Sequence, residues 1–120
     1  MEDKKDDLEL KELGQYYGTE SYHNVMNCQV TDGIAYIITN GYSWFVTDMI
    51  AVLKFPEDIK GIENADFLAI KLKLDGTKGT ATIEDGNGKV LYSQEYEYTD
   101  AKRELILYYT NGVLLLSGEY

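Results

Sequence analysis

The stretch from Ile83 to Gln94 holds the residue pattern most suggestive of metal chemistry, because its core, DGNGKV, resembles the middle of a calcium-binding EF-hand loop. With Gly88 at the sixth position of such a loop, Asp85 and Asn87 fall at the third and fifth positions, which supply oxygen ligands. The first position is then Ile83, which has no side-chain oxygen, and the twelfth is Gln94, which cannot act as a bidentate carboxylate. Asp, Gly and Asn are also the residues that tight turns require. We therefore interpret the stretch as a β-hairpin turn and expect no metal site.

The chain has one His and one Cys, His23 and Cys28, which lie five positions apart. A Cys and a His can form a nucleophilic pair, but such a pair needs a third group that orients the base, and none is evident in the sequence. A surface His and a half-buried Cys are the simpler interpretation. A single Cys also rules out an internal disulfide bond and leaves no basis for a cysteine zinc site.

Three carboxylates, Glu20, Asp32 and Asp48, are the remaining acid–base candidates. The sequence has no nucleophile elbow, phosphate-binding loop or cluster of metal ligands to accompany them, and these are the parts that identify an active site. We therefore predict that the protein is not an enzyme and binds no cofactor. A pair of carboxylates brought together only by folding would leave no trace in the sequence.

The net charge of −10 is spread along the chain, with −6 in residues 1–60 and −4 in residues 61–120. We expect no direct contact with nucleic acid, because phosphate contacts need clustered Lys and Arg. The acidity has two interpretations: a binding surface for a protein partner with a basic surface, or a coat that only keeps a small domain soluble. The candidate carboxylates for such a surface are Glu84, Glu95, Glu97, Asp100, Glu104, Glu57, Asp58, Glu63 and Asp66.

The first seven residues, MEDKKDD, are all charged after the Met, and we predict a disordered acidic terminus followed by a single domain over residues 8–120. A first helix is expected over residues 6–18, because Leu10, Leu13 and Tyr17 recur at helical spacing. Residues 31–55 then show two further helical patterns separated by an Asn-Gly pair, which can end a helix in the left-handed conformation.

The first of these two patterns is predicted to begin at a capping residue, Thr31 or Asp32. The second is expected to be the most buried helix, through Phe45, Val46, Met49, Ile50 and Leu53. Trp44 and Asp48 lie four residues apart on its flank, so the indole N–H can donate to the carboxylate. Such a pair is either a binding feature or a hydrogen bond at the edge of the core.

From Phe67 onward the pattern changes to a period of two, which indicates strands. FLAIKLKL places Leu68, Ile70, Leu72 and Leu74 on one side, and GTATIE is a second strand. In the third strand we expect Val90, Tyr92, Gln94, Tyr96 and Tyr98 on the inner face. The other face is expected to carry Lys89, Leu91, Ser93, Glu95 and Glu97. A last hairpin, LILYYTNGVLLLSGEY, turns at Asn111 and Gly112.

These elements predict an α+β fold, with two to three N-terminal helices packed on one face of a four- to five-stranded antiparallel meander. If the last strand lies at an edge of this sheet, its exposed apolar row can pair with a second copy of the chain. A homodimer is therefore one interpretation, with the candidate dimer edge formed by Val113, Leu114, Leu115 and Leu116.

Four segments, YGTESYH, TDGIAYIITNGYSWFVTDMIA, IEDGNGKVLYSQEYEYTD and NGVLLLSGEY, resemble in order and spacing a family of small proteins often found on phages and other mobile elements. The family is known only as a domain of unknown function, and the resemblance covers nearly all of the chain beyond residue 16. The sequence departs from the family pattern at Ser43 and at Ser117-Gly118, where Pro-Ser is usual. The residues that carry the resemblance are Gly18, Glu20, Tyr22, Thr31, Asp32, Gly33, Tyr36, Trp44, Asp48, Asp85, Gly86, Asn87, Gly88, Asn111, Gly112, Val113, Leu114, Leu115, Leu116, Glu119 and Tyr120.

The resemblance implies a mobile-element setting but no activity. In that setting we expect an anti-defence inhibitor of the anti-CRISPR type, which binds a basic nucleic-acid-binding surface of an effector. The alternative is a homodimeric protein-interaction or regulatory module of unknown target. The sequence shows neither an apolar leader nor an apolar run long enough to span a bilayer, so we expect a cytoplasmic protein of the bacterial host cell without membrane contact.

Overall fold

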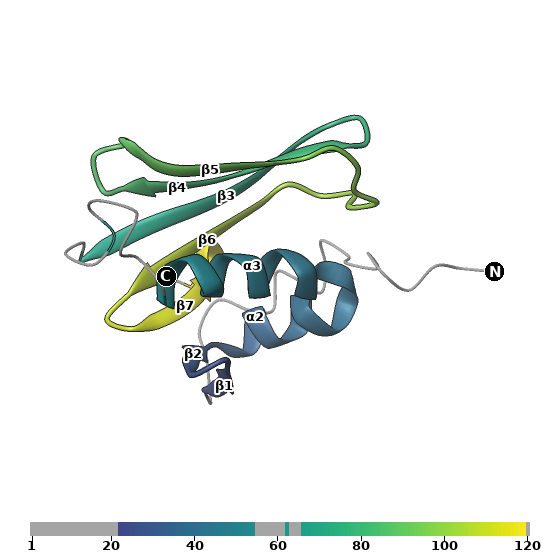
Figure 1. Ribbon diagram of the computed structural model, residues 1–120. Helices are drawn as coiled ribbons and strands as arrows, with labels where there is room; N and C mark the ends of the chain where they lie inside the picture. Colours follow the sequence, from purple (N-terminus) through teal and green to yellow (C-terminus); the bar gives the residue numbers. More distant parts are fainter. Residues whose placement is uncertain (1–21, 55–61, 63–65, 120) are drawn as a thin grey trace.

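The computed structural model describes residues 22–54, 62 and 66–119, in which one helical segment packs on one twisted sheet (Figure 1). The helical segment spans 23 residues and consists of α2 (Asp32–Ile37), η1 (Ile38–Tyr42) and α3 (Ser43–Lys54). The strands are β1 (His23–Val25), β2 (Cys28–Val30), β3 (Phe67–Asp75), β4 (Lys78–Asp85), β5 (Val90–Tyr96), β6 (Leu105–Thr110) and β7 (Val113–Leu116), and a 3₁₀ turn, η3 (Ser117–Glu119), follows β7. The predicted α+β class is confirmed.

The sheet has seven strands in the order β1-β2-β7-β6-β3-β4-β5, so the predicted four- to five-stranded antiparallel meander is wrong in strand number and in order. Only β3, β4 and β5 follow one another as a meander. The chain then returns to the far side of β3, where the buried residues Leu105 and Leu107 of β6 lie opposite Leu72 and Ile70. This pairing continues the buried face of the sheet, whereas β5 carries the exposed Glu95.

The number of helices is also corrected, because the described residues form one kinked helical segment and not two to three helices. The kink lies at Asn40 and Gly41, and Gly41 has a φ of 102°. The predicted Asn-Gly end does not end the helix, because side chains replace the lost backbone hydrogen bonds. The Asn40 amide donates to the carbonyl of Tyr36 at 2.7 Å, and the Trp44 indole donates to that of Gly41 at 2.9 Å. The helix predicted over residues 6–18 lies outside the described residues.

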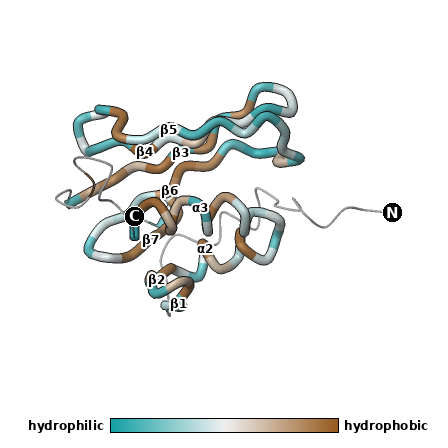
Figure 2. The backbone as a smooth tube through the Cα atoms, viewed as in Figure 1, coloured by the Kyte–Doolittle hydropathy of each residue, from teal (hydrophilic) through white to brown (hydrophobic). Residues whose placement is uncertain are grey.

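The core lies between the helical segment and one face of the sheet, and Figure 2 shows hydrophobic residues of both facing each other. The predicted buried face of α3 is confirmed, since Phe45, Val46, Met49, Ile50 and Leu53 are all buried. The predicted alternation in β3 is confirmed as well, with Leu68, Ile70 and Leu72 fully buried. We call the face of the sheet opposite α2 and α3 the outer face; it includes Lys71, Lys73, Thr80, Thr82, Glu84, Ser93 and Glu95.

The alternation predicted for β5 holds only from Tyr92 to Tyr96. The strand ends at Tyr96, so Tyr98, which was predicted to face inward, is 73% exposed, and a β-bulge interrupts the start of the strand. Ile83 of β4 pairs with Tyr92, but the next residue, Glu84, pairs with Val90, so Leu91 is an extra residue. Bulges of this kind change which face a side chain points to. As a result Leu91 packs against the core, while Val90 is 52% exposed instead of facing inward.

The last strand is not an edge, so the predicted dimer edge at Val113, Leu114, Leu115 and Leu116 is wrong. β7 lies between β6 and β2, with Val113 opposite Gln29 in a parallel pairing. The backbone N–H of Thr31 extends this pairing by donating to the carbonyl of Leu114 at 3.1 Å. Leu114, Leu115 and Leu116 are buried, so this row does not offer an apolar edge to a second copy.

Two predicted turns are confirmed. Asp85 accepts hydrogen bonds from the backbone N–H groups of Asn87 and Lys89 at 2.8 and 2.9 Å, so its carboxylate organises the β4–β5 turn. Asn111 and Gly112 both have positive φ angles, 54° and 77°, which suit a two-residue hairpin turn.

Candidate functional site

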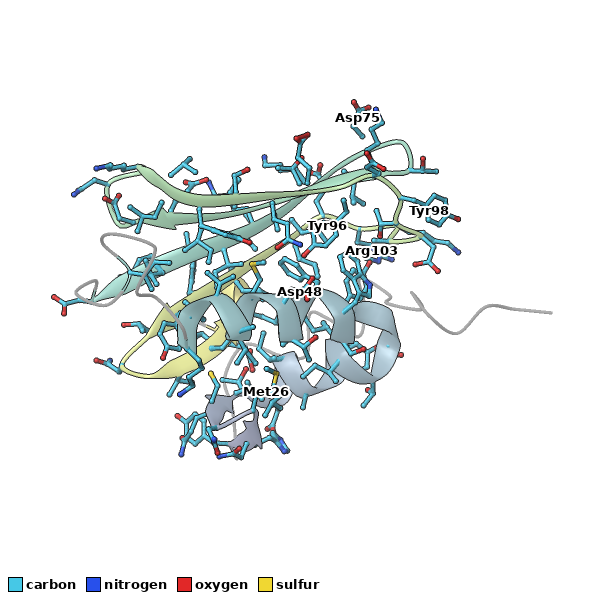
Figure 3. The ribbon with its side chains drawn as sticks, in the orientation of Figure 1. Met26, Asp48, Asp75, Tyr96, Tyr98 and Arg103 are labelled. Atoms are coloured by element: carbon cyan, nitrogen blue, oxygen red, sulfur yellow. The ribbon has the colours of Figure 1, made fainter. Side chains whose placement is uncertain are left out.

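A polar contact joins the helix to the sheet through Asp48 of α3 and Tyr96 of β5 (Figure 3). The Tyr96 hydroxyl donates to the Asp48 carboxylate at 2.9 Å, and the Trp44 ring meets the Tyr96 ring edge-on at 4.9 Å between centroids. The expected bond between Trp44 and Asp48 is therefore wrong, because the indole donates to Gly41 instead. Burial, and then the hydrogen bond to Asp48, raise the pKa of Tyr96 above its ordinary value of 10.0. The protonated Tyr96 hydroxyl therefore holds α3 against β5 through its hydrogen bond to Asp48.

His23 and Cys28 do not form a nucleophilic pair. The imidazole Nε2 of His23 lies 2.8 Å from the Asp32 carboxylate, on the exposed side of β1. Cys28 is almost fully buried, and its thiol lies 3.6 Å from the carbonyl of Gln29. Burial raises the pKa of the Cys28 thiol, an effect that the charge of Lys54 opposes. The thiol is therefore a core group rather than an activated nucleophile.

The predicted acidic surface divides into several parts. The carboxylate of Glu84 pairs with the ammonium group of Lys71 at 3.2 Å, and that of Glu104 accepts the backbone N–H of Leu74 at 2.9 Å. Asp66 is exposed and lies just before β3, whereas Asp75 lies at the other end of that strand. Glu57, Asp58 and Glu63 lie outside the described residues.

Two of the predicted residues, Glu95 and Glu97, lie together with Asp75 at a hollow of about 430 Å³, which we call the hairpin-end hollow. Its full lining is Lys73, Leu74, Asp75, Lys78, Gly79, Thr80, Glu95, Tyr96 and Glu97. Three carboxylates and two ammonium groups therefore meet at this end of the sheet. Of the net charge of −10, the described residues contribute −4, with 11 Asp and Glu and 7 Lys and Arg. The described residues therefore account for only part of the negative charge from which an acidic surface was predicted.

The carboxylate of Glu119 is a feature that sequence reasoning missed. Its Oε1 atom accepts hydrogen bonds from the Thr31 hydroxyl at 2.5 Å and from the Leu116 backbone N–H at 2.9 Å. Its Oε2 atom accepts the Gly33 backbone N–H at 3.1 Å. Gly33 permits this approach, since a Cβ there would lie 2.6 Å from Oε1 and 2.7 Å from Leu116 Cδ1. The carboxylate thus joins the chain end after β7 to the start of α2, where Thr31 is the predicted N-cap.

Beside this carboxylate lies a second hollow of about 350 Å³, which we call the Tyr22–Glu119 hollow. It is lined by Tyr22, Thr31, Thr110, Asn111, Val113, Leu115 and Glu119. The register of β7, β6 and β3 places Val113 and Leu115 on the outer face, the same face as Lys71. Three of the four sequence segments that carry the family resemblance meet at this hollow, and their shared resemblance was the signal in the sequence that could have pointed to the site. Their meeting could not be read from the sequence, because the residues in contact are up to 88 positions apart.

Within the described residues, no three His, Cys, Asp or Glu side chains are placed to hold a metal ion. No helix in this part of the chain is long and apolar enough to cross a membrane.

Comparison with known proteins gives one match. The model of the family of unknown function DUF6876 matches residues 7–120. No curated protein and no solved structure matches the chain. The match extends over nearly the whole sequence and includes the segments that line the Tyr22–Glu119 hollow. The chain therefore belongs to DUF6876, a family of unknown function.

Proposed function

We propose that the protein is a non-enzymatic binding protein that docks its outer face on a basic surface of a protein partner. The observation that carries this proposal is the placement of Glu95, Glu97 and Asp75 around the hairpin-end hollow. None of the three carboxylate groups has a hydrogen bond or ion pair to another residue that the structure describes. Exposed carboxylates of this kind attract Lys and Arg side chains and accelerate encounter with a basic partner.

The mobile-element setting implied by the family resemblance suggests which partner to test first. The proposal is then an anti-defence inhibitor of the anti-CRISPR type, which acts in the cytoplasm of a bacterial host. Its carboxylates would take the place of nucleic-acid phosphates in the basic groove of an effector, so binding should weaken steeply as salt is added. The net charge of −10 supports this choice of partner.

A homodimeric module receives less support, since β7 lies inside the sheet. The sheet edge at β5 is bulged and carries Glu95, and Glu97 follows the strand. Bulges and charges on an edge strand oppose edge-to-edge pairing.

The test is capture of purified CRISPR-Cas effectors by the tagged full chain at low and high salt, followed by an interference assay in cells. We expect salt-sensitive capture of an effector and restored phage infection, both reduced by Glu97→Lys. Asp100→Lys is the matched control, because it reverses another exposed charge that does not line either hollow. If no effector is captured at low salt and interference is intact, the inhibitor proposal fails for those systems.

A further inference from the structure

We infer that the Tyr22–Glu119 hollow receives an arginine side chain from the protein partner, and this inference rests on the proposed function above. Three features of the hollow match the three parts of an arginine. The floor is aliphatic, one wall is aromatic, and a carboxylate lies at the end.

The floor and wall suit the stem and the guanidinium plane. The half-buried Val113 and the small accessible part of Leu115, which is 9% exposed, form an aliphatic floor along which the methylene groups of an arginine can lie. Tyr22 is 57% exposed and lines the hollow, so its ring is accessible to a guanidinium group. Thr110 and Asn111 supply a polar rim, which keeps the hollow wetted when it is empty.

The Glu119 carboxylate can accept one further hydrogen bond. A carboxylate offers about four lone-pair sites, and three are taken by Thr31, Leu116 and Gly33. Both lone pairs of Oε1 are used, which leaves one on Oε2. Because its three hydrogen bonds already hold the carboxylate in place, no side-chain rotation is lost when a guanidinium N–H binds there.

Arginine fits this site better than lysine. Its guanidinium group is planar, stacks on aromatic rings and is more weakly hydrated than an ammonium group, so it loses less on entering a partly apolar hollow. A lysine would gain the same charge attraction but not the stacking on Tyr22.

The two hollows can belong to one interface, because both open on the outer face. β7 and β5 are about 19 Å apart across the sheet, and Val113 is in register with the start of β3 whereas Asp75 ends that strand, so the two hollows are about 30 Å apart. A standard interface covers about 800 Å² on each partner and spans this distance. The hairpin-end hollow then supplies long-range attraction, while the Tyr22–Glu119 hollow selects one side chain.

The first test is an NMR titration of the full chain with N-acetyl-L-arginine amide and, separately, with N-acetyl-L-lysine amide. We expect saturable amide shifts at Tyr22, Val113 and Leu115, with a dissociation constant on the order of 1 mM for the arginine probe. The lysine probe should bind several-fold more weakly. Tyr22→Ala should weaken binding of the arginine probe roughly fivefold. Tyr98→Ala is the matched control, since it removes an equally large ring that is 73% exposed elsewhere.

The outcomes separate this inference from the proposed function. Arginine shifts that map outside the hollow, or equal binding by Tyr22→Ala, would overturn the inference. An effector captured equally well by Tyr22→Ala and by the native chain would also overturn it, while the proposed function would stand. Specific arginine binding without capture of any effector would leave the hollow assigned and remove the proposed function.

Discussion

At the scale of single residues, Glu119 and Tyr96 connect parts of the chain that are distant in sequence. Glu119 joins the end of β7 to the first turn of α2 through three hydrogen bonds. Tyr96 joins β5 to α3 through one hydrogen bond to Asp48 and one ring contact with Trp44. Both side chains are partly buried, so each lost hydrogen bond would leave a polar group poorly solvated.

Glu119→Gln should lower the free energy of unfolding by about 1–3 kcal/mol, because an amide NH₂ group replaces one acceptor oxygen and faces backbone donors. Thr31→Ala should cost about 1 kcal/mol through loss of the N-cap. The double variant should lose less than the sum of the two, since Thr31 and Glu119 share a hydrogen bond. Chemical denaturation measures all three, with Glu97→Gln as the exposed control. Strict additivity would argue against a working contact between Thr31 and Glu119.

The raised pKa of Tyr96 predicts a loss of stability in alkali. An unfolded tyrosine ionises near pH 10, whereas folded Tyr96 stays protonated to higher pH. Its contribution is fully present below about pH 10 and is lost as the pH rises through the folded pKa, because the unfolded state releases its proton first. Cys28 and Tyr109, whose pKa values are also raised by burial, add to the loss.

Tyr96→Phe should therefore be less stable than the native chain at pH 7, by about 1 kcal/mol for the lost hydrogen bond, and should lose less stability above pH 10. Urea unfolding at a series of pH values measures both effects. Tyr98→Phe is the control for loss of a phenolic hydroxyl from an exposed side chain. Identical pH profiles for Tyr96→Phe and the native chain would contradict this account.

At the scale of elements, the β1–β2 hairpin is the least regular part of the described fold. Its strands have only three residues each, and both central residues of its turn, Met26 and Asn27, have positive φ angles. Such a turn favours Gly, which has no Cβ, and Asn, whose short polar side chain can hydrogen-bond locally. Methionine has neither advantage, so its backbone is strained there. Met26 is 48% exposed at the tip of the hairpin (Figure 3), so burial does not compensate for this strain.

Met26→Asn should raise the free energy of unfolding by about 1 kcal/mol, because asparagine tolerates the left-handed conformation that Met26 adopts at a φ of 53°. The midpoint of chemical denaturation measures the gain. Tyr98→Asn serves as the comparison, since it replaces another exposed apolar residue that lacks a positive φ, and it should change stability by less than about 0.5 kcal/mol. A loss of stability in Met26→Asn would show that the methionine has a packing role.

At the scale of the whole molecule, β7 closes the fold. It pairs with β6 on one side and with β2 on the other, so it joins the meander of β3 to β5 with the N-terminal hairpin. It also contributes Leu114 and Leu116 to the core, and the turn that follows it carries Glu119. Removing this strand would separate the two parts of the sheet.

A chain that ends at Gly112 should therefore be unfolded or molten, rather than a folded domain that has only lost a dimer contact. Circular dichroism and amide proton dispersion in NMR spectra would show the difference. Val113→Ala in the full chain is the control, because it shortens an outer-face side chain of β7 while it keeps the strand in place. A folded truncated chain would falsify the central role of β7.

Much of the local structure could be predicted from the sequence. The apolar face of α3, the alternation in β3 and the turns at Asp85–Gly88 and Asn111–Gly112 all depend on residues within a few positions of one another. Side-chain periodicity and turn chemistry express such short-range preferences directly. The short strands β1 and β2 escaped prediction, because three residues are too few to show a period.

The sequence by itself determined the α+β class, the inward faces of α3 and β3, and the assignment of DGNG to a turn. Only the tertiary structure decided that β6 returns to β3, that β7 lies beside β2 and that Glu119 reaches Thr31 and Gly33. The choice of strand partners depends on which buried faces continue across the whole sheet, and so on all residues at once. The Tyr22–Glu119 hollow exists only after those choices, because its walls come from three separate segments of the chain.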